Sequence, residues 1–163
     1  MSGICPDKTD VRILDVLQQE GRLSNVELAQ RVGLSPAPCL RRVRHLEEVG
    51  LIRDYVALLE PCRIGLGVQA YVSVTMDKRD EPALSAFHDA MQGAPEVLSC
   101  HALTGDMDYL VHVVAEDMAH FSRFLMDRLV RLAGVTDVKT SFLLQPVKQT
   151  TVLPLAHLRR KSQ

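Results

Sequence analysis

The sequence predicts an α+β protein, with an N-terminal helix-turn-helix (winged-helix-like) domain followed by a C-terminal ferredoxin-like βαββαβ domain. Residues 24–47 have the pattern of a helix, a tight turn and a second helix, with start and stop signals for each. Residues 68–144 instead have strand-like and helix-like segments in the order β-α-β-β-α-β, which is typical of a split βαβ sandwich. A proline and two glycines in residues 61–67 predict a linker, so the expected domains are residues 1–60 and 68–163.

The first two helices of the N-terminal domain are predicted from apolar spacing and end signals. Residues 10–17 carry apolar side chains at helical spacing. The next helix is expected to start at Ser24, because Ser24 and Glu27 can form a capping box in which each side chain accepts a backbone N–H. It is expected to end at Gly33, since glycine adopts positive φ without strain.

A third helix is predicted between Ser35 and Gly50. We expect the Ser35 side chain to cap this helix, and Pro36 falls at its first position, where no N–H partner is needed. Gly50 is expected to stop it. Residues 51–59 then alternate loosely between apolar and polar side chains, which predicts a strand that serves as a wing or hinge.

The third helix is predicted to have an apolar face and a basic face. From Leu40 to Leu46 it carries three arginines and no acidic residue. Arginine binds guanine bidentately or holds a phosphate, so the basic face predicts a contact with double-stranded DNA, and a solvated basic face is the alternative. The residues expected at the DNA are Ser24, Asn25, Ser35, Pro36, Ala37, Pro38, Arg41, Arg42, Arg44 and His45.

The charge of the chain limits how DNA is bound. The formal net charge is −1, and the first sixty residues hold 8 Lys/Arg and 9 Asp/Glu. A uniformly basic surface is therefore excluded, and DNA affinity must come from local clustering on the third helix. Two such helices in one assembly are expected to bind more tightly than one.

The second domain is expected to be a sheet covered by helices. Its strands are predicted at residues 68–76, 97–104, 109–115 and 138–144, and its helices at 81–92 and 118–132. Residues 68–76 alternate apolar and polar side chains, which indicates a strand with one buried face. The helices are expected to cover that face of the sheet, and a second subunit is the simplest cover for the other.

Several classes of protein are disfavoured by composition. No apolar run approaches the roughly 20 residues that span a bilayer, and residues 1–10 lack the apolar segment of a signal peptide, so we expect a cytoplasmic protein. The four cysteines form no C-x-x-C pair, so no metal site is expected. A disulfide is not expected in a cytoplasmic protein, and redox sensing by Cys62 or Cys100 is kept as an alternative. No catalytic constellation or cofactor motif is present, so we expect no enzyme and no cofactor. The basic run Arg159-Arg160-Lys161 is expected to be a disordered end.

Two separate motifs resemble the leucine-responsive/asparagine-responsive (Lrp/AsnC) regulator family of bacteria and archaea. The first comprises residues 10–14, 23–28 and 32–43, and the second is Cys100-His101-Ala102-Leu103-Thr104-Gly105-Asp106-Met107-Asp108-Tyr109-Leu110. The resemblance covers nearly the whole chain. It implies a transcription factor that responds to an amino acid and that forms homodimers through its sheets, which commonly assemble into octamers.

The resemblance also implies an effector site at a subunit interface. It assigns the small amino-acid effector to Thr104, Gly105, Asp106, Asp108 and Tyr109, with Val135, Thr136 and Asp137 as weaker candidates on the partner side. Glycine allows close approach of the backbone, and a carboxylate can pair with an α-ammonium group. An ordinary hairpin turn is the alternative for this loop. An effector-independent DNA-binding or assembly module is the alternative for the protein.

Overall fold

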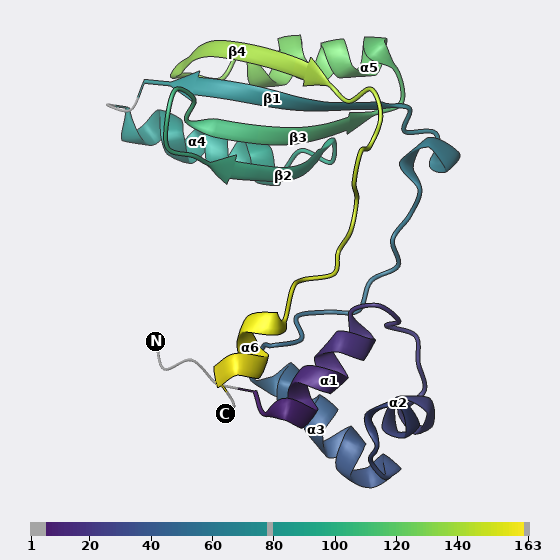
Figure 1. The fold of residues 1–163 in the computed structure, drawn as a ribbon. Coiled ribbons are helices and arrows are strands. Elements are labelled where there is room, and N and C mark those ends of the chain that lie inside the picture. The colour runs from purple at the N-terminus through teal and green to yellow at the C-terminus, as the bar shows by residue number, and fades with distance from the viewer. Residues whose placement is uncertain (1–5, 78–79, 162–163) are drawn as a thin grey trace. The chain divides into compact units, whose positions relative to one another are not determined.

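The computed structural model describes residues 6–77 and 80–161, and it divides into two compact units (Figure 1). One unit comprises Met1–Leu58 together with Lys148–Gln163, and the other comprises Leu59–Val147. The second domain was predicted to extend to residue 163, but residues 148–161 belong to the first unit. Among the described helices, none has the length and apolar character needed to span a membrane.

The first unit is a three-helix bundle with an added C-terminal helix. Its helices are α1 (Lys8–Leu17), α2 (Asn25–Val32), α3 (Pro36–Glu48) and α6 (Ala156–Lys161). The buried core residues are Ile13, Leu28, Ala29, Val32, Cys39 and Leu46. They lie on the apolar faces that the helical spacing predicted, so burial of these faces holds the bundle together.

Two local predictions for this unit are wrong. Residues 51–59 form no strand in the described chain, because the segment finds no ladder partner there, and Val56, Leu58 and Leu59 remain exposed. The basic run Arg159-Arg160-Lys161 was predicted as a disordered end, but it belongs to α6. The helix packs against α1, and this tertiary contact is not visible in a local pattern.

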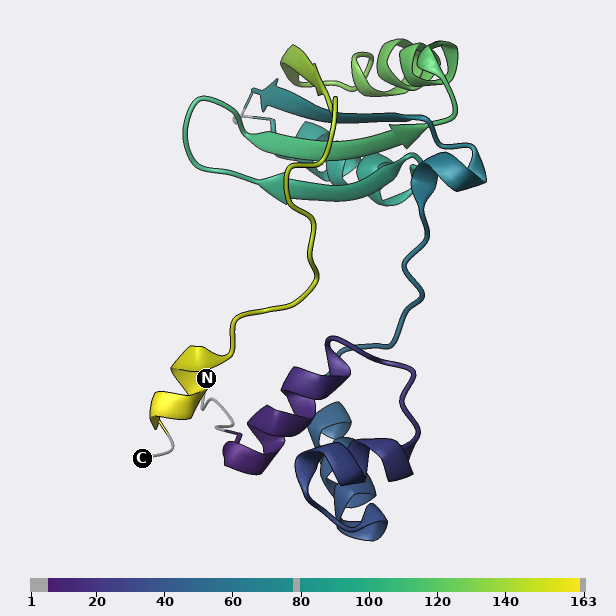
Figure 2. The same cartoon turned by 45° about the vertical axis from the view of Figure 1, so that its right-hand side comes forward.

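The second unit is a four-stranded antiparallel sheet with helices on one face (Figures 1 and 2). After a short 3-10 helix, η1 (Pro61–Ile64), its elements are β1 (Val68–Met76), α4 (Glu81–Gln92), β2 (Val97–Ala102), β3 (Tyr109–Ala115), α5 (Met118–Arg123), a π-helical segment η2 (Phe124–Leu129) and β4 (Val135–Phe142). The strand order β2-β3-β1-β4 is that of the predicted ferredoxin-like sandwich.

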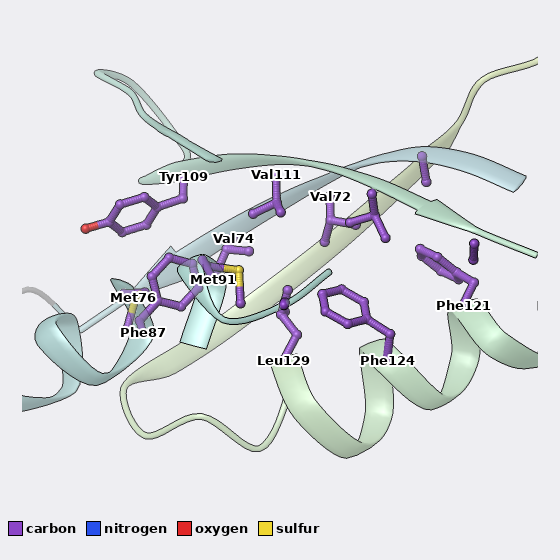
Figure 3. Close-up of a cluster of buried hydrophobic side chains, with 14 residues drawn as sticks. Val72, Val74, Met76, Phe87, Met91, Tyr109, Val111, Phe121, Phe124 and Leu129 are labelled. Atoms are coloured by element: carbon purple, nitrogen blue, oxygen red, sulfur yellow. The ribbon is translucent and has the colours of Figure 1, made fainter. Parts of the chain in front are cut away.

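The core of this unit lies between the sheet and its helices (Figure 3). Val72, Val74 and Val111 project from the central strands toward Phe87 of α4 and Phe124 of η2, and all five are at most 2% exposed. The alternate residues of β1 lie on the opposite face, where Tyr71 stacks on His112 of β3 with ring centroids 4.8 Å apart. That opposite face has no cover within the described chain.

Candidate functional site

The helix-turn-helix is set up by local hydrogen bonds at both ends of α2. Ser24 Oγ accepts from Glu27 N at 3.3 Å, and Ser24 N donates to Glu27 Oε2 at 2.9 Å, so the predicted capping box is confirmed. At the other end Gly33 has φ of 72°, which is the left-handed conformation that ends the helix without strain. The chain then enters α3 with Pro36 in its first turn.

The turn contains a hydrogen bond that the sequence did not reveal. Asn25 Nδ2 donates to the carbonyl oxygen of Pro36 at 2.8 Å, which ties the start of α2 to the start of α3. Ser35 occupies the N-cap position, but its side chain makes no capping hydrogen bond, so the predicted side-chain cap is wrong. The side chain of Asn25 therefore stabilises the turn, and the hydroxyl of Ser35 does not cap α3.

The basic residues of α3 differ in whether they form ion pairs within the unit or are exposed to solvent. Arg42 Nη1 lies 2.7 Å from both Asp7 Oδ2 and Asp10 Oδ1, and hydrogen bonds to Asp10 and Asp7 raise its pKa. These bonds fasten α3 to the start of α1. Arg41 and Arg44 are exposed along the same helix. Of the three arginines predicted at the DNA, Arg42 therefore has a structural partner within the unit.

The loop between β2 and β3 contains the predicted effector residues. It is closed by Leu103 N, which donates to Asp108 O at 2.8 Å. Gly105 has φ of 120°, in a region that L side chains rarely adopt, and no atom lies within 4 Å of a Cβ built there. Thr104 and Asp106 are exposed beside it. The loop thus presents accessible backbone and the exposed carboxylate of Asp106 to solvent.

Asp108 has a different environment from Asp106. The residue is 9% exposed, and its Oδ2 accepts from the backbone N–H of Met76 at 2.8 Å. Its own N–H donates to Val74 O at 3.0 Å. Asp108 therefore fixes the loop to the end of β1, a role that the spacing of the motif does not indicate.

Tyr109 is part of the core on the helix side of the sheet (Figure 3). Its ring lies 4.7 Å from that of Phe87, and its hydroxyl lies 2.8 Å from Nε2 of His88 on α4. Burial raises the pKa of Tyr109, and the neighbouring Cys100 and Asp108 add to the rise. A structural role for Tyr109 is thus visible, whereas an effector contact stays a prediction.

The two predicted effector segments lie at the same end of β1. Met76, whose N–H is held by Asp108, pairs with Val135 at the start of β4, and Thr75 pairs with Asp137. The hydroxyl of Thr136 donates to Thr75 O at 3.0 Å. Strand β4 begins at Val135 rather than at residue 138 as predicted, so Val135, Thr136 and Asp137 are strand residues and not loop residues.

Comparisons with known proteins match both units to one family. A model described as Lrp/AsnC ligand binding domain matches residues 69–153, and a model described as winged helix-turn-helix DNA-binding matches residues 6–53. The chain belongs to the Lrp/AsnC family. It is a transcriptional regulator with a DNA-binding helix-turn-helix and a ligand-binding domain, as the resemblance of its two motifs implied.

Relatives of this family member are similar over nearly its whole length. The leucine-responsive regulatory protein of Escherichia coli (strain K12) is 42% identical over 147 residues, which are 90% of this chain and 90% of that protein. A transcriptional regulator of Neisseria meningitidis, solved as a complex with L-methionine, is 50% identical with a TM-score of 0.91 and covers 94% of this chain and 99% of its own. An AsnC family transcriptional regulator of Agrobacterium tumefaciens is 36% identical with a TM-score of 0.86, over 93% and 99% of the two chains.

Proposed function

We propose that the chain is a sequence-specific DNA-binding regulator whose activity responds to an amino acid bound beside Gly105 at a subunit interface. The observation that carries the DNA part is the exposure of Arg41, Arg44 and His45 on α3, the second helix of the helix-turn-helix. A recognition helix of this kind contacts base edges and phosphates in the major groove. The function needs no catalysis and no cofactor.

The amino-acid part of the proposal is supported by the chemistry of the β2–β3 loop. The exposed Asp106 carboxylate suits an α-ammonium group, and the exposed loop around Gly105 allows a ligand to approach the backbone. The similar Neisseria meningitidis regulator was solved with L-methionine, which makes this amino acid the first to test. We also propose a homodimer, since a second subunit is the simplest cover for the open face of the sheet. Assembly of these dimers to an octamer is proposed from the resemblance to the Lrp/AsnC family alone.

The DNA proposal is tested by comparing arginines of α3. We expect Arg44→Gln to weaken binding to a specific operator by about 1–3 kcal/mol, because the glutamine cannot replace the bond of the guanidinium to a base or phosphate. Arg123→Gln is the matched control, since Arg123 is exposed on α5 in the other unit. Electrophoretic mobility shift on operator fragments selected from genomic DNA measures both variants. Equal binding by wild type and Arg44→Gln would contradict the recognition-helix assignment.

The alternative of an effector-independent DNA-binding module makes a different prediction for ligand addition. In that case none of the twenty amino acids changes either DNA affinity or thermal stability, while the effect of Arg44→Gln persists. For an effector-responsive regulator we expect at least one amino acid to change both.

A further inference from the structure

The C-terminal tail is joined to the DNA-binding unit by a pair of reciprocal hydrogen bonds. Gln18 Nε2 at the end of α1 donates to Leu153 O at 3.1 Å, and Leu153 N donates to Gln18 Oε1 at 2.8 Å. C-terminal to these two hydrogen bonds, α6 packs against α1 within the same unit (Figure 1). The helix Ala156–Lys161 is thus part of the unit that contains the helix-turn-helix.

The tail changes the net charge of that unit. Residues 1–58 contain 8 Lys/Arg and 8 Asp/Glu, so their formal charge is zero. Residues 148–163 add Lys148, Arg159, Arg160 and Lys161 and no acidic residue, which brings the unit to +4. Residues 59–147 hold 7 Lys/Arg and 12 Asp/Glu, a charge of −5. The DNA-binding unit is cationic only when the tail is counted with it.

The charge of α6 lies outside the part of the chain that the family model describes. The match to the Lrp/AsnC ligand binding domain ends at residue 153, and α6 begins at Ala156. Three of the four basic residues of the tail are consecutive in this helix, Arg159, Arg160 and Lys161. Neither family domain therefore accounts for them.

We propose that α6 is a second DNA-contacting element, which adds phosphate contacts to those of α3. The inference rests on the proposed DNA-binding function. The two hydrogen bonds between Gln18 and Leu153 lead into α6, which packs against α1 in the cationic unit, and the negative charge of DNA is the complementary partner of that unit. Because phosphate contacts carry no sequence information, α6 raises affinity for any duplex and leaves the choice of sequence to α3.

The experiment measures the salt dependence of DNA binding by the full chain. A fluorescent mixed-sequence duplex of about 30 base pairs is titrated with wild type and with Arg159→Gln/Arg160→Gln at several potassium chloride concentrations, and log K is plotted against log salt. We expect the variant to bind more weakly at low salt, with a slope reduced by about 0.9 for each phosphate that the variant no longer neutralises. The matched control is Arg63→Gln/Arg123→Gln, which removes the same charge from exposed positions of the other unit.

Two further variants separate charge from folding of the tail. Arg159→Lys/Arg160→Lys keeps the charge and is expected to bind like wild type. Gln18→Ala keeps every basic residue but removes both hydrogen bonds to Leu153, and its affinity is expected to lie between wild type and the double glutamine variant. A full loss of affinity in the double lysine variant would overturn the phosphate assignment.

The outcomes distinguish this inference from the proposed function. If Arg44→Gln weakens binding while Arg159→Gln/Arg160→Gln has the wild-type affinity and slope, α6 does not contact DNA and the regulator proposal stands. An equal effect in Arg63→Gln/Arg123→Gln also overturns the role of α6, because the effect is then one of total charge. If the glutamine variant instead changes the sedimentation coefficient with DNA binding intact, the basic residues of α6 act in subunit assembly, and their proposed contact with DNA is overturned.

Discussion

At the scale of single residues, Asp106 and Asp108 show how two similar side chains take different tasks. Asp106 is exposed on the β2–β3 loop, whereas Asp108 is buried and holds the backbone N–H of Met76. A buried donor that loses its acceptor destabilises the fold, while an exposed carboxylate has little effect on stability. The proposed contact with the amino acid and the observed contact that supports the fold therefore fall on different residues.

We expect Asp108→Ala to lower the free energy of unfolding by about 1–3 kcal/mol, because the Met76 N–H is left without its acceptor in a buried place. We expect Asp106→Ala to change it by no more than about 0.5 kcal/mol and yet to lose the response to L-methionine. Urea unfolding measures the first effect and a thermal-shift titration the second. An Asp106→Ala protein with the full methionine shift would remove Asp106 from the site.

In the DNA-binding unit, Arg42 likewise differs in its contacts from two neighbouring residues of the same type. Its place between Arg41 and Arg44 on a basic helix predicted a DNA contact, but its guanidinium pairs with Asp7 and Asp10. Those acids lie 35 and 32 positions away along the chain, so no local pattern indicates the pairing. Arg41 and Arg44 are exposed, and a DNA contact by these two residues stays a prediction.

At the scale of elements, the open face of the sheet contains a partly buried histidine. His112 on β3 stacks on Tyr71 of β1, and its Nε2 is buried without a hydrogen-bond partner among the described residues. Burial lowers the pKa of His112 from the ordinary value of 6.5. The neutral ring is therefore the form that the folded sheet favours.

The sign of the pH effect follows from this lowered pKa. Above 6.5 the ring is neutral in both states, and as pH falls below 6.5 the unfolded chain takes up the proton first, so stability is lost until the folded pKa is passed. We expect the melting temperature of wild type to fall between about pH 7 and pH 5 more steeply than that of His112→Gln. His101→Gln is the control, because His101 is exposed on β2. Parallel curves for wild type and His112→Gln would contradict the assignment.

Helix ends show the opposite case, in which local chemistry suffices. The capping box of Ser24 with Glu27 and the left-handed Gly33 were both predicted, and both are confirmed. Each feature depends on residues within a few positions of one another, so a short stretch of sequence contains every residue that forms it. The strand predicted at residues 51–59 is wrong for the same reason. A strand needs a hydrogen-bonded partner strand, and the local sequence does not show whether one is present.

At the scale of the whole molecule, the chain divides its charge between its two units. The unit with the helix-turn-helix and the tail carries +4 and the ligand-binding unit −5, although the total is only −1. Such a distribution confines attraction for DNA to one unit and reduces non-specific contacts by the other. The net charge of the chain conceals this asymmetry.

A regulator that binds both DNA and an amino acid must obey thermodynamic linkage. If L-methionine changes operator affinity by some factor, the operator must change the affinity for L-methionine by the same factor. Calorimetric titration of the amino acid into the free protein and into its operator complex tests this equality. In the Asp106→Ala variant we expect L-methionine to leave operator affinity unchanged and the operator to leave L-methionine affinity unchanged. Unequal factors in wild type would indicate more than one class of ligand site.

The sequence by itself determined the two types of domain, the order of their elements and the place of the Gly105 loop. Apolar periodicity, caps and turn residues act over a few positions, and they are legible without the fold. Tertiary structure alone decided that Asp108 is buried, that Arg42 pairs with α1 and that the tail joins the DNA-binding unit. These features depend on contacts between residues 32 to 135 positions apart, where packing chooses among side chains that look equivalent along the chain.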